Sequence, residues 1–307
     1  MDIYRYFREN FDGHSNTNAY LLALASLFVY HDKAPGPVEG SFVTRIRWLF
    51  KHLSDSDPLD VEIFSGNHTL PYDTECAVLT NSKIIIVAFR GTEGITGVQD
   101  WATSADHLMR DAPSSWGNVK VHRGFYNALK EVYQDVRTYV REQIQQNGNR
   151  KVFLTGHSLG GALATVCAYR FQQVGSVYVH GVYTFGAPRV GDKEFKKLYD
   201  SVLLSRTYRW VNDDDFAAKM PDFAGAPSPI TNVTTYYHVG QLNHIHANGT
   251  VDMNHPDFEP GLTLSDSDHN MIGYCEHIWN QLADKERTSA ASPNYLLKRD
   301  VPLTVVL

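Results

Sequence analysis

A Gly-x-Ser-x-Gly pentapeptide lies at residues 156–160, between an apolar segment and a segment rich in small residues. Residues 152–154 read Val-Phe-Leu, which is typical of a buried strand, and residues 160–164 read Gly-Gly-Ala-Leu-Ala, which suits a closely packed helix. A serine on such a sharp strand-to-helix turn takes a strained backbone conformation, and the flanking glycines let the neighbouring chain approach closely. The pattern predicts that Ser158 is presented at the carboxyl end of a strand, before a helix N-terminus that favours negative charge.

Strand-like and helix-like segments alternate on both sides of this turn. The continuous apolar run at 84–89 suits a central strand that is covered on both faces. We expect strands at 75–79, 84–89, 151–155, 177–185 and 206–211, and helices at 15–31, 43–53, 124–145, 159–172, 193–203 and 269–283. Residues 225–267 are interpreted as an irregular, loop-rich stretch. The alternation favours an α/β fold with a mostly parallel central sheet flanked by helices.

The chain of 307 residues contains no internal repeat, and α/β folds of this length often form one domain. We therefore expect a single domain over residues 1–307, with its core at about 75–283. Residues 1–74 are interpreted as an N-terminal helical segment and residues 284–307 as a C-terminal tail. Three cysteines, Cys76, Cys167 and Cys275, cannot all pair, and we expect three buried thiols.

Composition excludes some partners. A net charge of −6 offers no basic patch, so nucleic acid is not an expected partner.

Residues 1–10 mix acids and bases and lack an apolar core, so the sequence as given predicts no signal peptide. The expected location is the cytoplasm, or outside the cell if a leader was removed. The apolar run at 19–30 is too short to span a bilayer and is expected to be a core helix. A monomer is favoured, although the sequence does not fix the oligomeric state.

A serine hydroxyl is a weak nucleophile unless a base, itself oriented by an acid, takes its proton. On a strand–Ser–helix turn of this kind the acid and then the histidine follow the serine along the chain. Three aspartates at 213–215 follow an expected strand, and their order alone does not choose among them. The later histidines are His238, His244, His246, His255, His269 and His277. His269 opens the last helix after a loop, where a base can reach Ser158, while His157 is expected to point away from the serine and to be non-catalytic.

A second group of imidazoles and carboxylates offers an alternative chemistry. His244 and His246 form a His-x-His pair, and Asp252 stands three residues before His255. These residue types suit a zinc or calcium site. A hydrogen-bonded polar loop near the rim of the active site is the preferred interpretation, so no metal and no cofactor are predicted.

Several motifs in register resemble those of the class 3 lipases, the fungal triacylglycerol lipase family with its bacterial relatives. They are the stretches 87–92, 121–125, 155–162 and 185–192 and the pair Asp268-His269, and the likeness covers roughly residues 75–282. The resemblance implies an α/β-hydrolase fold. It also implies a triad of Ser158, Asp215 and His269, and an oxyanion hole formed by Thr92 and the backbone N–H of Leu159.

The family also has a mobile lid, which would correspond here to residues 93–98. This stretch is short and has only Ile95 and Val98 as sizeable apolar residues, which departs from the large lid of strict triglyceride lipases. The expected activity is hydrolysis of acylglycerols or similar lipid esters, with transient contact at a lipid–water interface. A phospholipase A1, a feruloyl-type esterase, an acyltransferase and a non-catalytic binding protein are the alternatives.

Overall fold

The computed structural model describes residues 3–10, 13–30, 57–66, 74–91, 109–175, 177–221, 236–255, 265, 267–290 and 292–293. The helix expected at 43–53 lies outside these residues. The expected lid at 93–98 and the oxyanion candidate Thr92 also lie outside them. Everything below concerns the described part of the chain.

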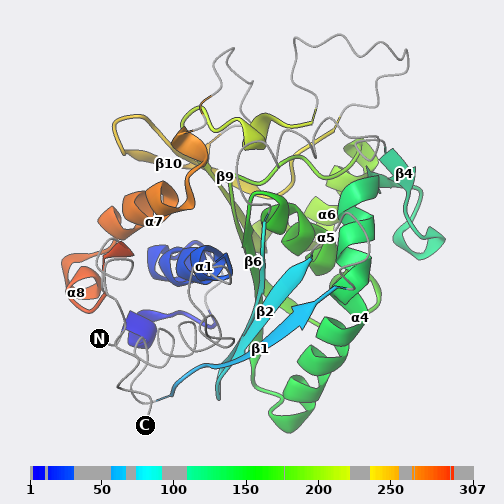
Figure 1. Ribbon diagram of the computed structural model, residues 1–307, viewed down its shortest axis with the longest axis horizontal. Coiled ribbons are helices and arrows are strands. Elements are labelled where there is room, and N and C mark those ends of the chain that lie inside the picture. Colours follow the sequence, from blue (N-terminus) through cyan, green and yellow to red (C-terminus); the bar gives the residue numbers. More distant parts are fainter. Residues whose placement is uncertain are drawn as a thin grey trace, which may run out of the picture.

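A single sheet of eight strands forms the centre of the molecule (Figure 1). In spatial order the strands are β1 (Asp60–Ser65), β2 (Glu75–Thr80), β3 (Ile84–Phe89), β6 (Lys151–His157), β7 (Val179–Phe185), β8 (Thr207–Asn212), β9 (Gln241–Ile245) and β10 (Val251–His255). The five strands from β3 to β9 are mutually parallel, whereas β1–β2, β2–β3 and β9–β10 pair antiparallel. The prediction of a mostly parallel central sheet is therefore confirmed.

Helices cover both faces of this sheet. On one face lie α1 (Asn16–Phe28) and α7 (Met271–Asn280), and on the other lie α4 (Arg123–Gln146), α5 (Leu159–Gln173) and α6 (Lys193–Leu203) (Figure 1). The smaller elements are α8 (Asp284–Arg287), the β4–β5 pair (Met109–Asp111 and Lys120–His122) and five 3-10 turns at Ile3–Tyr6, Ser114–Trp116, Leu204–Arg206, Ala217–Lys219 and Ser267–His269.

The side chains of β3 explain why the sheet needs two helical layers. Ile84, Ile86 and Ala88 pack in the core beneath α1 and α7, while the intervening residues Ile85, Val87 and Phe89 pack beneath α4 and α5. Alternate residues of a strand point to opposite faces, so an uninterrupted apolar run requires cover on both sides. Helix α1 is buried along nearly its whole length, which fulfils the expectation of a core helix.

Two parts of the sheet were not predicted. The segment 1–74, interpreted as helical, contributes the edge strand β1, in which buried Val61 is flanked by exposed Asp60 and Glu62. The stretch 225–267, interpreted as loop-rich, contributes β9 and β10. Strand β9 buries Asn243 and His244 beside Leu242 and Ile245, so its sequence lacks the apolar alternation that marks a strand.

The described helices include none with the length and apolarity that a membrane span requires. Cys76, Cys167 and Cys275 are buried free thiols, as expected. Burial raises the pKa of each of these thiols well above its ordinary value, which keeps them protonated.

Candidate active site

Ser158 lies at the junction of β6 and α5, where its backbone is strained. Its φ is 54° and its ψ is −128°, a backbone conformation that residues other than glycine rarely adopt. Ser158 also forms the N-cap of α5. The backbone N–H of Ser158 donates to the carbonyl oxygen of Phe185 on β7 at 2.9 Å. The strain is thus held by the sheet, as the strand–turn–helix pattern predicts.

The glycines around Ser158 are required by close packing. A Cβ at Gly156 would lie 2.3 Å from the backbone of Gly160, and a Cβ at Gly160 would lie 2.2 Å from the carbonyl oxygen of Phe89. Such distances are far below van der Waals contact, so no other residue fits without movement of the chain. Because β3, β6 and α5 approach one another this closely, the turn holds the Ser158 hydroxyl in a fixed place.

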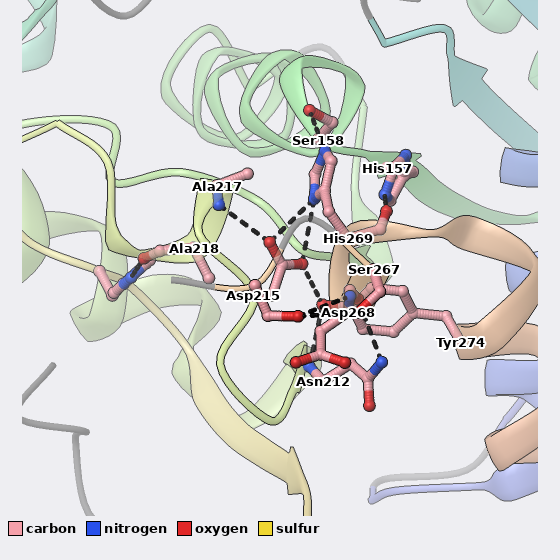
Figure 2. A network of polar contacts seen from close by, with 12 residues as sticks. His157, Ser158, Asn212, Asp215, Ala217, Ala218, Ser267, Asp268, His269 and Tyr274 are labelled. Atoms are coloured by element: carbon pink, nitrogen blue, oxygen red, sulfur yellow. Dashed lines mark hydrogen bonds and ion pairs between the residues drawn. The ribbon is translucent and has the colours of Figure 1, made fainter. Parts of the chain in front are cut away.

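The structure brings Ser158, His269 and Asp215 together from three separate segments (Figure 2). Ser158 Oγ lies 3.0 Å from His269 Nε2, and His269 Nδ1 lies 2.9 Å and 3.1 Å from the two carboxylate oxygens of Asp215. All three side chains are buried, with Asp215 at 0% exposure. The Asp215 carboxylate can only accept a hydrogen bond, so His269 Nδ1 carries the ring proton and donates to it. His269 Nε2 is then free to accept a hydrogen bond from the Ser158 hydroxyl.

Further donors hold the Asp215 carboxylate. The backbone N–H of Ala217 donates to Oδ1 at 2.9 Å, and the Tyr274 hydroxyl donates to Oδ2 at 2.5 Å. Burial and then the neighbouring Asp215 charge raise the pKa of Tyr274 well above its ordinary value, so this hydroxyl stays a donor. The Tyr274 oxygen also accepts from the backbone N–H of Asn212, whose side chain donates to the carbonyl of Asp268. Neither Tyr274 nor Asn212 was singled out from the sequence.

The other two aspartates of the acidic turn have different neighbours. Asp213 adopts a φ of 36°, and its carbonyl oxygen lies 3.3 Å from His244 Nε2. The Asp214 carboxylate pairs with the Lys219 ammonium at 2.8 Å. Among the three candidates, Asp215 is therefore the one whose carboxylate contacts His269.

The imidazole of His157 lies beside that of His269, with ring centroids 4.5 Å apart. His157 Nε2 donates to the backbone carbonyl of His269 at 2.8 Å, and its Nδ1 accepts from the Tyr30 hydroxyl at 2.9 Å. Burial, and then the charge of His269, lower the pKa of His157 well below its ordinary value, so the ring is neutral. The sequence reasoning assigned His157 no role beyond the turn, whereas the structure places it in the support of the histidine.

Leu159, the second oxyanion candidate, is the first residue of α5. The first N–H groups of an α-helix have no partner within the helix, and they carry its positive dipole end. The backbone N–H of Leu159 is therefore suited to stabilise negative charge next to Ser158 Oγ.

The second imidazole group lies on the β9–β10 hairpin. His246 Nε2 pairs with Asp252 at 2.9 Å, and the ring centroids of His244, His246 and His255 are 4.7–6.4 Å apart. Within the described ranges, no three His, Cys, Asp or Glu side chains are arranged to share a metal ion. One histidine of this hairpin, His244, reaches the main chain of the acidic turn at Asp213.

Gly186 follows β7 and leaves room for the triad. With φ at +55°, a Cβ here would lie 2.3 Å from Asp215 Oδ2 and 3.1 Å from His269 Nδ1. We expect Gly186→Ala to displace the carboxylate and to lower kcat for an ester about a hundredfold, since a shift of about 1 Å in catalytic geometry has an effect of that order.

Gly175 provides the matched control for this substitution. Its φ is +60°, but a Cβ there would have no heavy atom within 4 Å. Gly175→Ala therefore carries the same backbone strain, about 1–2 kcal/mol, without the clash. Melting temperatures and kcat are measured for both variants, and equal loss of activity in the two would refute the role given to Gly186.

Comparison with known proteins agrees with this geometry. Residues 86–224 match the family model described as lipase (class 3). This part of the chain resembles the class 3 lipases. The chain is 34% identical over 170 residues to a lipase of Rhizomucor miehei, and 32% identical over 139 residues to a secreted mono- and diacylglycerol lipase of Fusarium solani. The solved structure of the Rhizomucor miehei triacylglyceride lipase matches with a TM-score of 0.63 at 25% identity, over 83% of this chain and 92% of that one.

These matches confirm the expected resemblance to the class 3 lipases and the α/β-hydrolase fold. The aligned part covers 54% of this chain and 46% of the Rhizomucor lipase sequence, and 45% of this chain and 40% of the Fusarium relative. The chain thus spans less than half the length of these relatives.

Proposed function

We propose that this protein is a class 3 lipase that hydrolyses carboxylic esters of lipids, acylglycerols in particular, through an acyl-enzyme on Ser158. The observation that carries the proposal is the continuous path from Ser158 Oγ to His269 Nε2 at 3.0 Å and from His269 Nδ1 to Asp215 Oδ1 at 2.9 Å. A nucleophile, a base within proton-transfer reach and an orienting acid are the parts that acyl transfer requires.

In the first half of the reaction, Ser158 Oγ attacks the ester carbonyl carbon while His269 Nε2 takes the hydroxyl proton. The carbonyl oxygen becomes an oxyanion, for which we assign the N–H of Leu159 and Thr92 as donors. Each such donor accounts for about 3 kcal/mol in comparable hydrolases. The C–O bond to the alcohol then breaks, and the imidazolium returns its proton to the leaving alkoxide.

In the second half, His269 removes a proton from water, and the resulting hydroxide attacks the acyl carbon. Collapse of this intermediate breaks the acyl–Oγ bond, returns the proton to Ser158 and releases the carboxylic acid. Asp215 holds Nδ1–H throughout and stabilises the imidazolium. All bonds formed and broken are accounted for by side chains and water, so the proposed reaction requires no cofactor.

The substrate class is supported by the named relatives, of which one is a lipase and another a mono- and diacylglycerol lipase. Acylglycerols form emulsions and bilayers, so the proposal includes transient contact with a lipid–water interface. We propose that the chain acts as a single α/β-hydrolase domain and as a monomer.

A substrate panel tests the proposal. Rates are measured on p-nitrophenyl butyrate, octanoate and palmitate, and on emulsified mono-, di- and triacylglycerols, with a phospholipid and a hydroxycinnamate ester in parallel. We expect turnover of the p-nitrophenyl esters and of at least one acylglycerol. Turnover of the phospholipid or the hydroxycinnamate alone would replace the acylglycerol assignment with a phospholipase or a feruloyl-type esterase.

Covalent labelling provides a second, independent readout. A p-nitrophenyl alkylphosphonate is expected to modify the protein at one equivalent, with the mass increase on the peptide that contains Ser158. Absence of label and of turnover on every ester would refute the hydrolase assignment.

A further inference from the structure

Tyr30 lies where three segments of the active site meet. It follows α1 directly, and its hydroxyl oxygen is 2.9 Å from His157 Nδ1 and 3.4 Å from the carbonyl oxygen of His157. It also lies against Gly91, where a Cβ would be 2.0 Å from the Tyr30 oxygen. Gly91 follows strand β3 and directly precedes Thr92, the oxyanion candidate. One phenol therefore contacts both the strand end before Thr92 and the turn before Ser158.

The hydrogen bonds of His157 fix its tautomer. The backbone carbonyl of His269 can only accept, so Nε2 carries the ring proton and donates to it at 2.8 Å. In the neutral ring Nδ1 is then an acceptor, and the Tyr30 hydroxyl is its donor. The two bonds hold opposite edges of the imidazole, so loss of the Tyr30 hydroxyl leaves the ring held by the carbonyl of His269 alone.

His157 acts on the proposed base, His269, by holding its main chain. Asp215 holds the ring of His269 at Nδ1, while His157 holds the carbonyl of the same residue. His269 ends the 3-10 turn Ser267–His269 rather than lying within a long helix, so its backbone position depends on such contacts. The two rings are 4.5 Å apart, so a neutral His157 also avoids repulsion when His269 becomes positively charged.

We propose that Tyr30 is a positioning residue, whose hydroxyl holds the imidazole of His157 where it anchors the backbone of His269 and so sets the distance from His269 to Ser158. The inference rests on the proposed hydrolase function. It assigns no contact between Tyr30 and the substrate.

Tyr30→Phe tests the inference, because it removes one oxygen and keeps the ring. We expect kcat for p-nitrophenyl butyrate to fall about tenfold, the effect of one lost hydrogen bond, with KM within twofold of wild type. Tyr199→Phe is the matched control, since the buried Tyr199 hydroxyl bonds to Thr207 at the start of β8, far from the triad. That variant is expected to keep the wild-type kcat.

A spectroscopic readout separates positioning from general destabilisation. Nitrogen-15 NMR of histidine-labelled protein is expected to show His157 protonated at Nε2 in all three proteins. The Nδ1 resonance of His157 is expected to shift in Tyr30→Phe, where the hydrogen bond from Tyr30 is lost, and to stay unchanged in Tyr199→Phe. His157→Gln, whose amide retains a donor toward the carbonyl of His269, is expected to keep more activity than His157→Leu.

The outcomes distinguish the two proposals. Inactivity of the wild-type chain on all esters would refute the hydrolase function, whereas an unchanged kcat in Tyr30→Phe, in a chain that does hydrolyse esters, would refute only the positioning role. Equal losses in Tyr30→Phe and Tyr199→Phe would also refute it, as would an unchanged Nδ1 resonance of His157.

Discussion

Ser158→Ala is expected to lower kcat for p-nitrophenyl butyrate by about six orders of magnitude, as removal of the nucleophile does in comparable hydrolases. The substitution leaves His269 and Asp215 in place but removes the atom that forms the acyl-enzyme. The fold is expected to persist, because the strained backbone of Ser158 is held by the N–H bond to Phe185 and by the packed glycines rather than by the hydroxyl.

The measurement combines steady-state kinetics with phosphonate labelling and thermal unfolding. Wild-type protein is expected to release a burst of p-nitrophenol equal to the enzyme concentration if deacylation limits the rate, and Ser158→Ala to give neither burst nor label. Ser201→Ala is a suitable control, since this exposed hydroxyl bonds only within α6, to Leu198. A Ser158→Ala variant that retains more than a hundredth of the wild-type rate would contradict the assignment of the nucleophile.

The position of Ser158 on a strained strand-to-helix turn was predictable because its determinants are local. The strand, the turn and the helix that place Ser158 follow one another within residues 151–173, and the glycines that permit the turn stand in the same segment. The carboxylate that contacts His269 was less predictable from residues alone. Three consecutive aspartates have nearly the same local environment in the sequence, and the turn that places Asp215 beside His269 depends on backbone bonds to distant segments, such as Asp213 N–H to Ile245 and Ser265 N–H to Asp214.

Edges of the sheet were harder to predict than its centre. Strand β3 is buried on both faces and is apolar throughout, so its sequence identifies it. Strand β9 is also buried, but it carries the polar residues Asn243 and His244. His244 Nε2 lies 3.3 Å from the carbonyl oxygen of Asp213 on the acidic turn, 31 residues away in the sequence. Such polar residues interrupt the apolar pattern from which a buried strand is predicted.

The residues that contact Asp215 and His157 could not be predicted from the sequence for the same reason. Tyr274 is one of 17 tyrosines in the chain, and what distinguishes it is contact with Asp215, which lies 59 residues away. Tyr30 reaches His157 across 127 residues. Gly186 alone had a local indication, since a glycine directly after a buried strand suggests a close approach or a positive φ.

Asp215→Asn is the second large effect that we expect, with kcat lowered about ten-thousandfold. The carboxylate accepts from His269 Nδ1, Ala217 N–H and the Tyr274 hydroxyl. An amide has one oxygen and one NH₂ group, so either His269 or Tyr274 would face a donor. When the NH₂ group faces His269, the imidazole keeps its proton on Nε2, and it can no longer accept the proton of Ser158.

Asp213→Asn is the matched control, because asparagine tolerates the positive φ at this position and the Asp213 side chain has no role in the proposed triad. Its kcat is expected to stay within about twofold of wild type.

Asp214→Asn removes the charge that pairs with buried Lys219, so it is expected to lower the melting temperature while the folded fraction retains turnover. Kinetics and thermal unfolding of the three variants separate these effects. The residue that fixes the tautomer of His269 is the one whose negative charge turnover requires. A ten-thousandfold loss of kcat in Asp213→Asn or Asp214→Asn, with Asp215→Asn still active, would therefore contradict the assignment of Asp215 as the acid.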